Sequence, residues 1–224
     1  MQTYDEITDN PERAAAFNRY AEMLRERNEK INLTAITEPE EVKVKHFLDS
    51  CSAAELLPGG ASVLDIGSGA GFPGLPLKIV RPDLTVTLLD SVNKKVAFVS
   101  DVVAELKLSG VTAVHARIED FPHKGEYDAV VSRAVAELST LAEYALPFVK
   151  IGGAFIAYKS EKAESEAEAA ASAITLLGGR IREIREVFVA AGLTRKLIII
   201  DKIAPTPPKY PRGKNLPRLK PLGK

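Results

Sequence analysis

The 224-residue sequence contains no tryptophan, a single cysteine (Cys51) and no long apolar run. One cysteine excludes an internal disulfide and a cysteine-based zinc cluster, and it suits a cytoplasmic protein. The run Leu197-Ile198-Ile199-Ile200 is four residues long, whereas a membrane-spanning helix needs about 20 apolar residues. The first residues lack the basic and apolar regions of a signal peptide. We therefore expect a cytoplasmic, monomeric globular protein with no membrane partner and no bound metal.

Acidic residues are also missing from the C-terminal end of the chain. Residues 202–224 carry seven basic residues and no acidic one, although the formal net charge of the chain is zero. A basic tail on an acidic body predicts a polyanionic partner for the tail. Six prolines between Pro205 and Pro221 predict that residues 204–224, the C-terminal segment, form an extended and partly mobile tail.

The first 60 residues have the pattern of helices, and we call them the N-terminal cap. Asn10-Pro11-Glu12 supplies an N-cap, a first-turn proline and an acid for one helix. Thr37-Glu38-Pro39-Glu40 has the spacing of a capping box and predicts a second helix that extends to about Leu57. Pro58-Gly59-Gly60 ends this region.

From residue 61 to residue 203 strand and helix patterns alternate, which predicts a mostly parallel sheet with helices on both faces. The link from Ala190 to Thr194 is too short for a crossover helix, so the last two strands should pair as an antiparallel hairpin. The expected strands are 62–66, 84–89, 111–115, 128–132, 153–158, 181–189 and 195–202. The expected helices are 72–80, 93–107, 137–149 and 161–177.

The most informative motif is the glycine loop, Asp65-Ile66-Gly67-Ser68-Gly69-Ala70-Gly71-Phe72-Pro73-Gly74. Glycines between a strand and a helix allow a sharp turn and a close ligand approach. Gly69-x-Gly71-x-x-Gly74 fits a dinucleotide fingerprint. The frame Asp65-x-Gly67-x-Gly69-x-Gly71 instead fits the S-adenosylmethionine (SAM) loop of class I methyltransferases, in which an acid suits a cationic ligand.

Two further acidic positions separate these alternatives. Asp90 closes the second strand, where it can accept hydrogen bonds from ribose hydroxyls. Ile118-Glu119 follows the third strand, where it can cover an adenine and accept from its amino group. Either acid alone could be a solvated residue at a strand end. Their succession, together with the antiparallel hairpin, favours SAM over NAD and a class I SAM-dependent, Rossmann-like α/β fold.

Four motifs resemble the RsmG (GidB) family: Asn32-Leu33-Thr34-Ala35-Ile36, His46-Phe47-Leu48-Asp49-Ser50, the glycine loop continued to Lys78, and Ser132-Arg133-Ala134-Val135-Ala136. The resemblance implies an enzyme that uses SAM, releases S-adenosylhomocysteine, and methylates N7 of a guanine at position 527, in the 530 loop of bacterial 16S rRNA. The implied partner is 16S rRNA or a small ribosomal subunit particle. Family members often have Trp where this chain has Arg27, and Lys-Gly where it has Lys159-Ser160, so a non-catalytic SAM- or RNA-binding module is the alternative.

The resemblance and the motif positions together give the expected site. Arg133, His46 and Asp49 are candidates for a catalytic role, although no residue is a certain catalyst. The expected cofactor-binding residues are Asp65, Gly67, Ser68, Gly69, Gly71, Phe72, Asp90, Ile118, Glu119 and Arg133. The expected RNA-binding residues are Asn32, Ser50, Lys159, Lys209, Arg212 and Lys214.

Guanine N7 has an in-plane lone pair and no proton, so its methylation needs no general base. The sequence accordingly has no evident catalytic dyad, and we expect catalysis by alignment of the reactants. We also expect deletion of residues 205–224 to weaken RNA binding and leave SAM affinity nearly unchanged.

Overall fold

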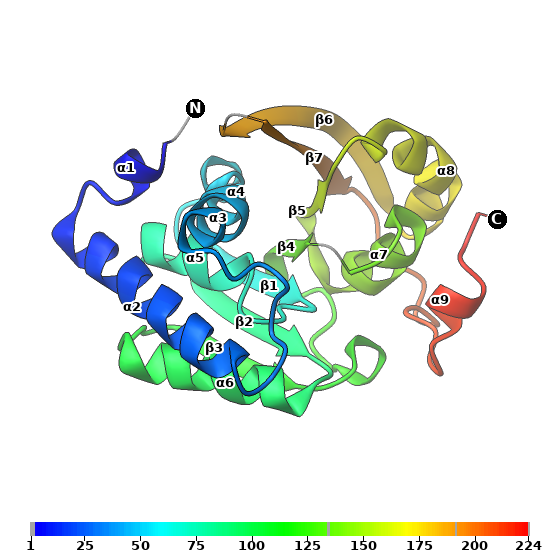
Figure 1. Cartoon of the computed structure of the whole chain (residues 1–224). Coiled ribbons are helices and arrows are strands. Elements are labelled where there is room, and N and C mark those ends of the chain that lie inside the picture. Colours follow the sequence, from blue (N-terminus) through cyan, green and yellow to red (C-terminus); the bar gives the residue numbers. More distant parts are fainter. Residues whose placement is uncertain (1–2, 134, 191, 224) are drawn as a thin grey trace.

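The computed structural model describes residues 3–133, 135–190 and 192–223. Its centre is a seven-stranded sheet in the order β3-β2-β1-β4-β5-β7-β6 (Figure 1). Strands β1 to β5 pair in parallel, whereas β7 runs antiparallel to both β5 and β6. This confirms the predicted sheet and hairpin. The strands are β1 Ser62–Ile66, β2 Thr85–Asp90, β3 Val111–His115, β4 Tyr127–Arg133, β5 Val149–Lys159, β6 Gly179–Ala190 and β7 Leu193–Lys202.

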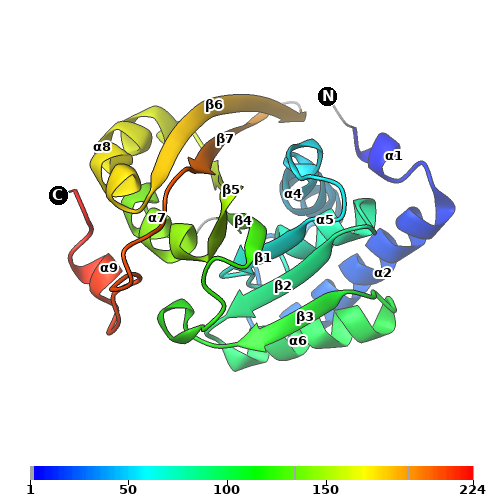
Figure 2. The same cartoon turned by 180° about the vertical axis from the view of Figure 1, so that it is seen from behind.

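Helices cover both faces of the sheet (Figures 1 and 2). One face carries α5 (Gly74–Val80) and α6 (Asn93–Glu105), with α2 (Pro11–Asn28) packed outside them. The other face carries α7 (Leu138–Ala145) and α8 (Ala163–Leu176). Central strands are apolar on both sides, as parallel strands between helices must be: Val63 and Leu64 are fully buried in the two opposite cores. No helix within the described ranges is long and apolar enough to cross a membrane.

The N-terminal cap is partly as expected. Helix α2 begins after Asn10, whose side-chain oxygen accepts from the backbone N–H groups of Glu12 and Arg13. The second helix differs from the prediction, because its N-cap is Glu38 and no side chain caps it. It also changes form along its length. Its parts are α3 (Pro39–Val42), a π-helix (Lys43–Leu48), α4 (Asp49–Cys51) and a 3₁₀ turn (Ala54–Leu56), and a short α1 (Tyr4–Ile7) precedes α2.

The cap supports the glycine loop through aromatic side chains. Tyr20 and Phe47 are fully buried and pack on each other and on Phe72 of the loop, with ring centroids 5.2 to 6.1 Å apart. The Tyr20 hydroxyl donates to the carbonyl oxygen of Ala70. The cap and the sheet therefore share one hydrophobic core. Through Tyr20 and Phe47 the cap packs against the glycine loop and holds it in place.

The prediction of an extended tail is wrong for the C-terminal segment, which packs along α7 and forms α9 (Leu216–Leu219) (Figures 1 and 2). The reason is a buried acid on α7. The carboxylate of Glu143, fully buried, binds the Arg212 guanidinium through Nε (2.8 Å) and Nη2 (2.6 Å). The Thr140 hydroxyl donates to Pro217 O, and Lys124 donates to the carbonyl oxygen of the buried Tyr210.

Candidate functional site

A cavity of about 500 Å³ lies at the carboxyl-terminal edge of the parallel strands. Open α/β sheets bind ligands at this edge, and the volume falls in the range of small-molecule sites. Five of the expected cofactor-binding residues line the cavity: Gly67, Asp90, Ile118, Glu119 and Arg133. They come from the ends of β1, β2 and β4 and from the turn after β3.

Gly67 forms a bare stretch of backbone on the cavity wall. Its φ of +70° lies in the left-handed region, which favours glycine. A Cβ at this position would lie 2.6 Å from Cγ2 of Val135. Its N–H donates to the carbonyl oxygen of Leu89 at 2.8 Å, which ties the loop to β2. The left-handed φ favours glycine, and the close approach of Val135 leaves no space for a Cβ at this position.

Asp90 ends β2 with a carboxylate that is held in place and still faces the cavity. Its Oδ2 accepts from Gly69 N–H at 2.9 Å, and its Oδ1 accepts from Val92 N–H at 2.8 Å. Each carboxylate oxygen has a second lone pair that can accept from a ligand hydroxyl. Ile118 is buried in a short 3₁₀ turn and supplies an apolar wall beside Glu119.

Asp65 does not line the cavity, and its expected contact with the cofactor stays a prediction. The side chain is fully buried, and its Oδ2 accepts from Gly74 N–H at 2.8 Å, across the glycine loop. Oδ1 has no hydrogen-bond partner within the described ranges. Burial raises the pKa of this carboxyl group to about 7. Asp65 therefore joins the two ends of the loop.

Four more expected contacts, Ser68, Gly69, Gly71 and Phe72, do not line the cavity, and their contact with the cofactor stays a prediction. The carbonyl oxygen of Ser68 accepts from the N–H groups of Gly71 and Phe72, both at 2.8 Å. A Cβ on Gly71 would lie 2.5 Å from Leu75 Cδ1. These residues shape the loop, whereas Gly67 presents it to the ligand.

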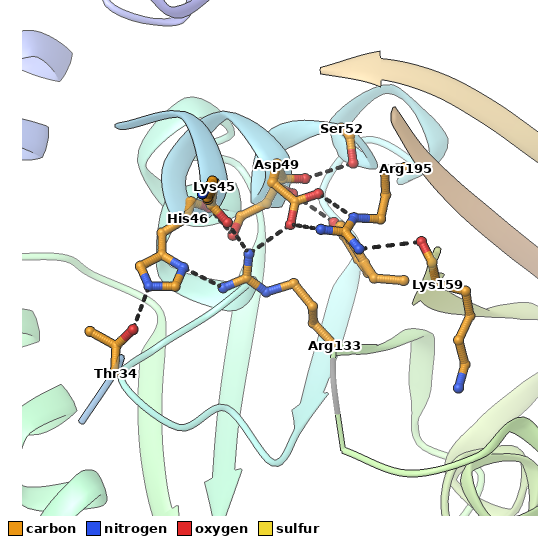
Figure 3. Close-up of polar contacts among 10 residues, drawn as sticks. Thr34, Lys45, His46, Asp49, Ser52, Arg133, Lys159 and Arg195 are labelled. Atoms are coloured by element: carbon orange, nitrogen blue, oxygen red, sulfur yellow. Dashed lines mark hydrogen bonds and ion pairs between the residues drawn. The ribbon is translucent and has the colours of Figure 1, made fainter. Parts of the chain in front are cut away.

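Arg133 connects the cavity to the N-terminal cap (Figure 3). Its Nη1 donates to Asp49 Oδ2 and to the carbonyl oxygen of Lys45, both at 2.8 Å. Its Nη2 lies 3.1 Å from His46 Nδ1, and its guanidinium lies 5.1 Å from the centre of the Phe72 ring. The structure thus brings together the three residues that the sequence offered as catalytic candidates, Arg133, His46 and Asp49.

His46 is held as a neutral ring. It stacks on Phe72 with ring centroids 4.4 Å apart, and its Nε2 lies 2.7 Å from Thr34 Oγ1. Burial, helped by the nearby Arg133 cation, lowers the pKa of the imidazole to about 4. Because Arg133 has only donors, Nδ1 must accept and Nε2 carries the proton. His46 therefore orients Arg133 and does not face the cavity itself.

Sequence reasoning missed Arg195, the second cation on Asp49. Arg195 near the start of β7 binds the Asp49 carboxylate with Nε (2.6 Å) and Nη2 (2.9 Å), as Figure 3 shows. Asp49 is fully buried, so it needs these partners. The antiparallel direction of β7 could have suggested the placement, because it brings the first residues of β7 to the carboxyl edge of β5.

Three of the expected RNA-binding residues have other partners. The Ser50 hydroxyl is fully buried and donates to His46 O at 2.5 Å, which excludes contact with RNA in this structure. The Lys159 ammonium group binds Glu166 (2.6 Å) and the carbonyl oxygen of Ala136 (2.7 Å). Arg212 is paired with Glu143, as described above. Buried or partly buried polar groups acquire such partners because desolvation is costly.

The other three, Asn32, Lys209 and Lys214, are exposed. Their contact with RNA stays a prediction. Four basic side chains line the cavity beside two acidic ones: Lys95, Arg117, Arg133 and Arg218 against Asp90 and Glu119. Only Arg133 among these cations was expected. No group of three or more His, Cys, Asp and Glu residues that could hold a metal ion occurs within the described ranges.

The sequence is similar to proteins of one family. A family model, GidB, described as rRNA small subunit methyltransferase G, matches residues 13–196. Ribosomal RNA small subunit methyltransferase G of Desulforamulus reducens is 46% identical over 226 residues, which cover 97% of this chain and 92% of that protein. The protein of the same name from Alkaliphilus metalliredigens is 48% identical over 210 residues, covering 91% and 88%.

Solved structures with the same fold are more distant in sequence. A SAM-dependent methyltransferase from Aquifex aeolicus superposes with a TM-score of 0.57 at 17% identity, covering 80% of this chain and 98% of that one. TYW2 of M. jannaschii, solved in complex with AdoMet, superposes with a TM-score of 0.58 at 17% identity, covering 69% and 75%. These similarities concern the fold.

Proposed function

The chain belongs to the GidB family of rRNA small subunit methyltransferases G, and on this premise we propose that it transfers the methyl group of SAM to N7 of a guanine in 16S rRNA. Membership confirms the predicted family and, with it, SAM in place of NAD as the cofactor. The observation that carries the proposal is the cavity at the ends of β1, β2 and β4, with Gly67, Asp90 and Arg133 on its walls.

The residues present fit SAM, which supplies an electrophilic methyl group when bound. Gly67 adds no side chain to the wall, and a Cβ there would collide with Val135, another residue of the cavity wall. The Asp90 carboxylate, fixed by two backbone donors, would accept from the ribose hydroxyls. Ile118 and Glu119 would contact the adenine, and Arg133 would bind the carboxylate of the methionine part.

Catalysis is then a matter of alignment. Guanine N7 carries no proton, so the site needs no general base, and the neutral His46 lies off the cavity wall. A guanidinium that is clamped by Asp49, His46 and Phe72 cannot swing. Holding two reactants in line lowers an activation barrier by several kcal/mol. We assign this contribution to Arg133, held in place by Asp49, His46 and Phe72.

The surplus of basic side chains around the cavity supports an RNA substrate. Lys95, Arg117 and Arg218 line the opening together with Arg133, and cations at such a site attract phosphate groups. Exposed Lys209 and Lys214 extend this basic surface along the C-terminal segment. We further infer that the protein acts as a monomer in the bacterial cytoplasm on rRNA or on a small-subunit particle, in keeping with its membership of an rRNA methyltransferase family.

Methyl transfer from tritiated SAM tests the proposal. The protein is incubated with 16S rRNA, and separately with small-subunit particles, from cells that lack the modification. We expect label in one of the two, and primer extension or mass spectrometry should place it on a guanine N7 of the 530 loop. Absence of label from both substrates would refute the proposed activity and favour a non-catalytic binding module.

A further inference from the structure

The C-terminal segment forms part of the wall of the cofactor cavity. Asn215 and Arg218 line the cavity together with Gly67, Asp90 and Arg133, although they lie about 80 residues or more beyond Arg133 in the chain. Asn215 precedes α9 with a φ of +58°, and Arg218 is an exposed residue of α9. The segment that the sequence presented as a separate tail therefore reaches the site.

Side-chain contacts anchor this segment on the body of the protein. The Arg212–Glu143 ion pair is bidentate, and its acid is fully buried. The Thr140 hydroxyl holds Pro217 O at 3.0 Å, and the Tyr210 ring is buried. A buried ion pair with two parallel hydrogen bonds fixes both position and orientation. These contacts fix the segment against α7.

Arg218 also contacts the part of the chain that packs on the glycine loop. Its Nη2 donates to the carbonyl oxygen of Val135 at 3.3 Å. Val135 lines the cavity, and its Cγ2 lies 2.6 Å from the position that a Cβ on Gly67 would take. Arg218 therefore holds the residue that packs directly against the bare backbone of Gly67.

From these contacts we propose that the segment from Tyr210 to Leu219 is a component of the SAM site and that Arg218 is a positioning residue for the cofactor. The inference rests on the proposed function only in that the cavity holds SAM. The Arg218 guanidinium sets the place of Val135 and adds a cation to the wall. We therefore now expect deletion of residues 205–224 to weaken SAM binding, whereas the sequence alone predicted a nearly unchanged SAM affinity.

Isothermal titration of SAM into the 224-residue protein tests the proposal. We expect Arg218→Gln to weaken SAM binding about tenfold, which is the size of one lost charged hydrogen bond. Arg218→Lys keeps the charge and replaces the guanidinium with an ammonium donor group. Its SAM affinity should lie between those of Arg218→Gln and the unaltered protein. Lys220→Gln is the matched control, because it removes a positive charge two residues away at a side chain that does not line the cavity. It should bind SAM as the unaltered protein does.

A second variant tests the anchoring without touching the cavity. Arg212→Gln breaks the pair with Glu143, which we expect to weaken SAM binding by a similar factor and to speed amide hydrogen exchange over residues 210–219. Saturating SAM should slow exchange in this segment in the unaltered protein. The exchange rates of residues 210–219 report directly on this part of the cavity wall, whether or not the substitution also changes the melting temperature.

The outcomes separate the inference from the proposed function. If the unaltered protein fails to bind SAM, the proposed function fails. If it binds SAM and both Arg218→Gln and Arg212→Gln bind it equally well, the C-terminal segment is not part of the site and the inference is overturned. Equal losses in Arg218→Gln and Lys220→Gln would also overturn it, because the effect would then follow charge alone.

Discussion

Arg195 grips Asp49 with two parallel hydrogen bonds, Nε to Oδ1 at 2.6 Å and Nη2 to Oδ2 at 2.9 Å. The pair joins the last strand of the chain to the N-terminal cap, and the same carboxylate also receives Arg133 from the cavity. Asp49 therefore helps to orient the Arg133 guanidinium. Removal of one buried partner from such a cluster leaves an uncompensated charge, which costs far more than the net value of the pair.

Replacement of Asp49 should consequently destabilise the whole fold. We expect Asp49→Asn to lower the free energy of unfolding by about 3–5 kcal/mol, measured by urea denaturation. Asp101→Asn, which removes the half-exposed partner of Arg27, is the control and should cost less than about 1 kcal/mol. Equal effects of the two substitutions would show that the buried Asp49 carboxylate contributes no more to stability than an exposed ion pair does.

The glycine loop offers a prediction with a closely matched control. Gly67→Ala introduces a Cβ 2.6 Å from Val135 in a left-handed conformation, so SAM affinity should fall at least about tenfold. Gly67→Asp adds a carboxylate to the wall and should abolish binding. Gly60→Ala has the same strain (φ +67°) with nothing within 4 Å and should cost about 1–2 kcal/mol of stability without changing SAM affinity. A normal SAM affinity in Gly67→Ala would contradict the assignment of Gly67 to the wall of the SAM site.

Two buried groups make opposite contributions to the pH dependence of stability. The pKa of His46 is lowered from 6.5 to about 4, so the unfolded chain binds a proton that the folded one does not, and stability falls as pH drops from 6.5 to 4. The pKa of Asp65 is raised from 3.8 to about 7, so the folded chain holds the extra proton, and stability falls as pH rises from 4 to 7. Between pH 4 and 6.5 the two slopes oppose each other.

Single variants should therefore uncover these slopes. In His46→Gln only the contribution of Asp65 to the pH dependence of stability remains. The free energy of unfolding of this variant should therefore fall relative to that of the unaltered protein as pH rises from 4 to 6.5. Asp65→Asn should give the reverse trend over the same range. Each slope is at most about 1.4 kcal/mol per pH unit. Urea denaturation at several pH values measures both, and parallel curves for the two variants would contradict the pKa assignments.

The exposed lysines of the C-terminal segment should account for part of the salt dependence of RNA binding. Lys209 and Lys214 face solvent, whereas Arg212 is engaged by Glu143. The double variant Lys209→Gln/Lys214→Gln should reduce the slope of log K against log salt by about 1.4–1.8, measured by filter binding. Lys107→Gln, an exposed lysine after α6 at the opposite edge of the sheet, should leave the slope unchanged. An unaltered slope in the double variant would remove these lysines from the RNA contact.

Local patterns were sufficient to predict the sheet and much of the cavity. The glycine loop begins at the end of β1, Asp90 is the last residue of β2, and Glu119 lies in the turn after β3, so the parallel sheet brings all three to one edge whatever the details of packing. The residues that the sequence misplaced depend on distant partners. Nothing near Arg212 in the sequence indicates that Glu143 is buried beneath it, and proline spacing does not reveal packing on α7. The division into residues 1–60, 61–203 and 204–224 stays a prediction.

The long sequence separations in the Asp49 cluster have a kinetic consequence. Asp49 lies 84 residues from Arg133 and 146 residues from Arg195. Contacts between such distant residues require large loops to close, and they form late in folding. The clamp on Arg133 therefore assembles only after the cap has docked and the hairpin has joined the sheet. During refolding, the ability to bind cofactor should appear in the slowest phase, after the helices and the central strands have formed.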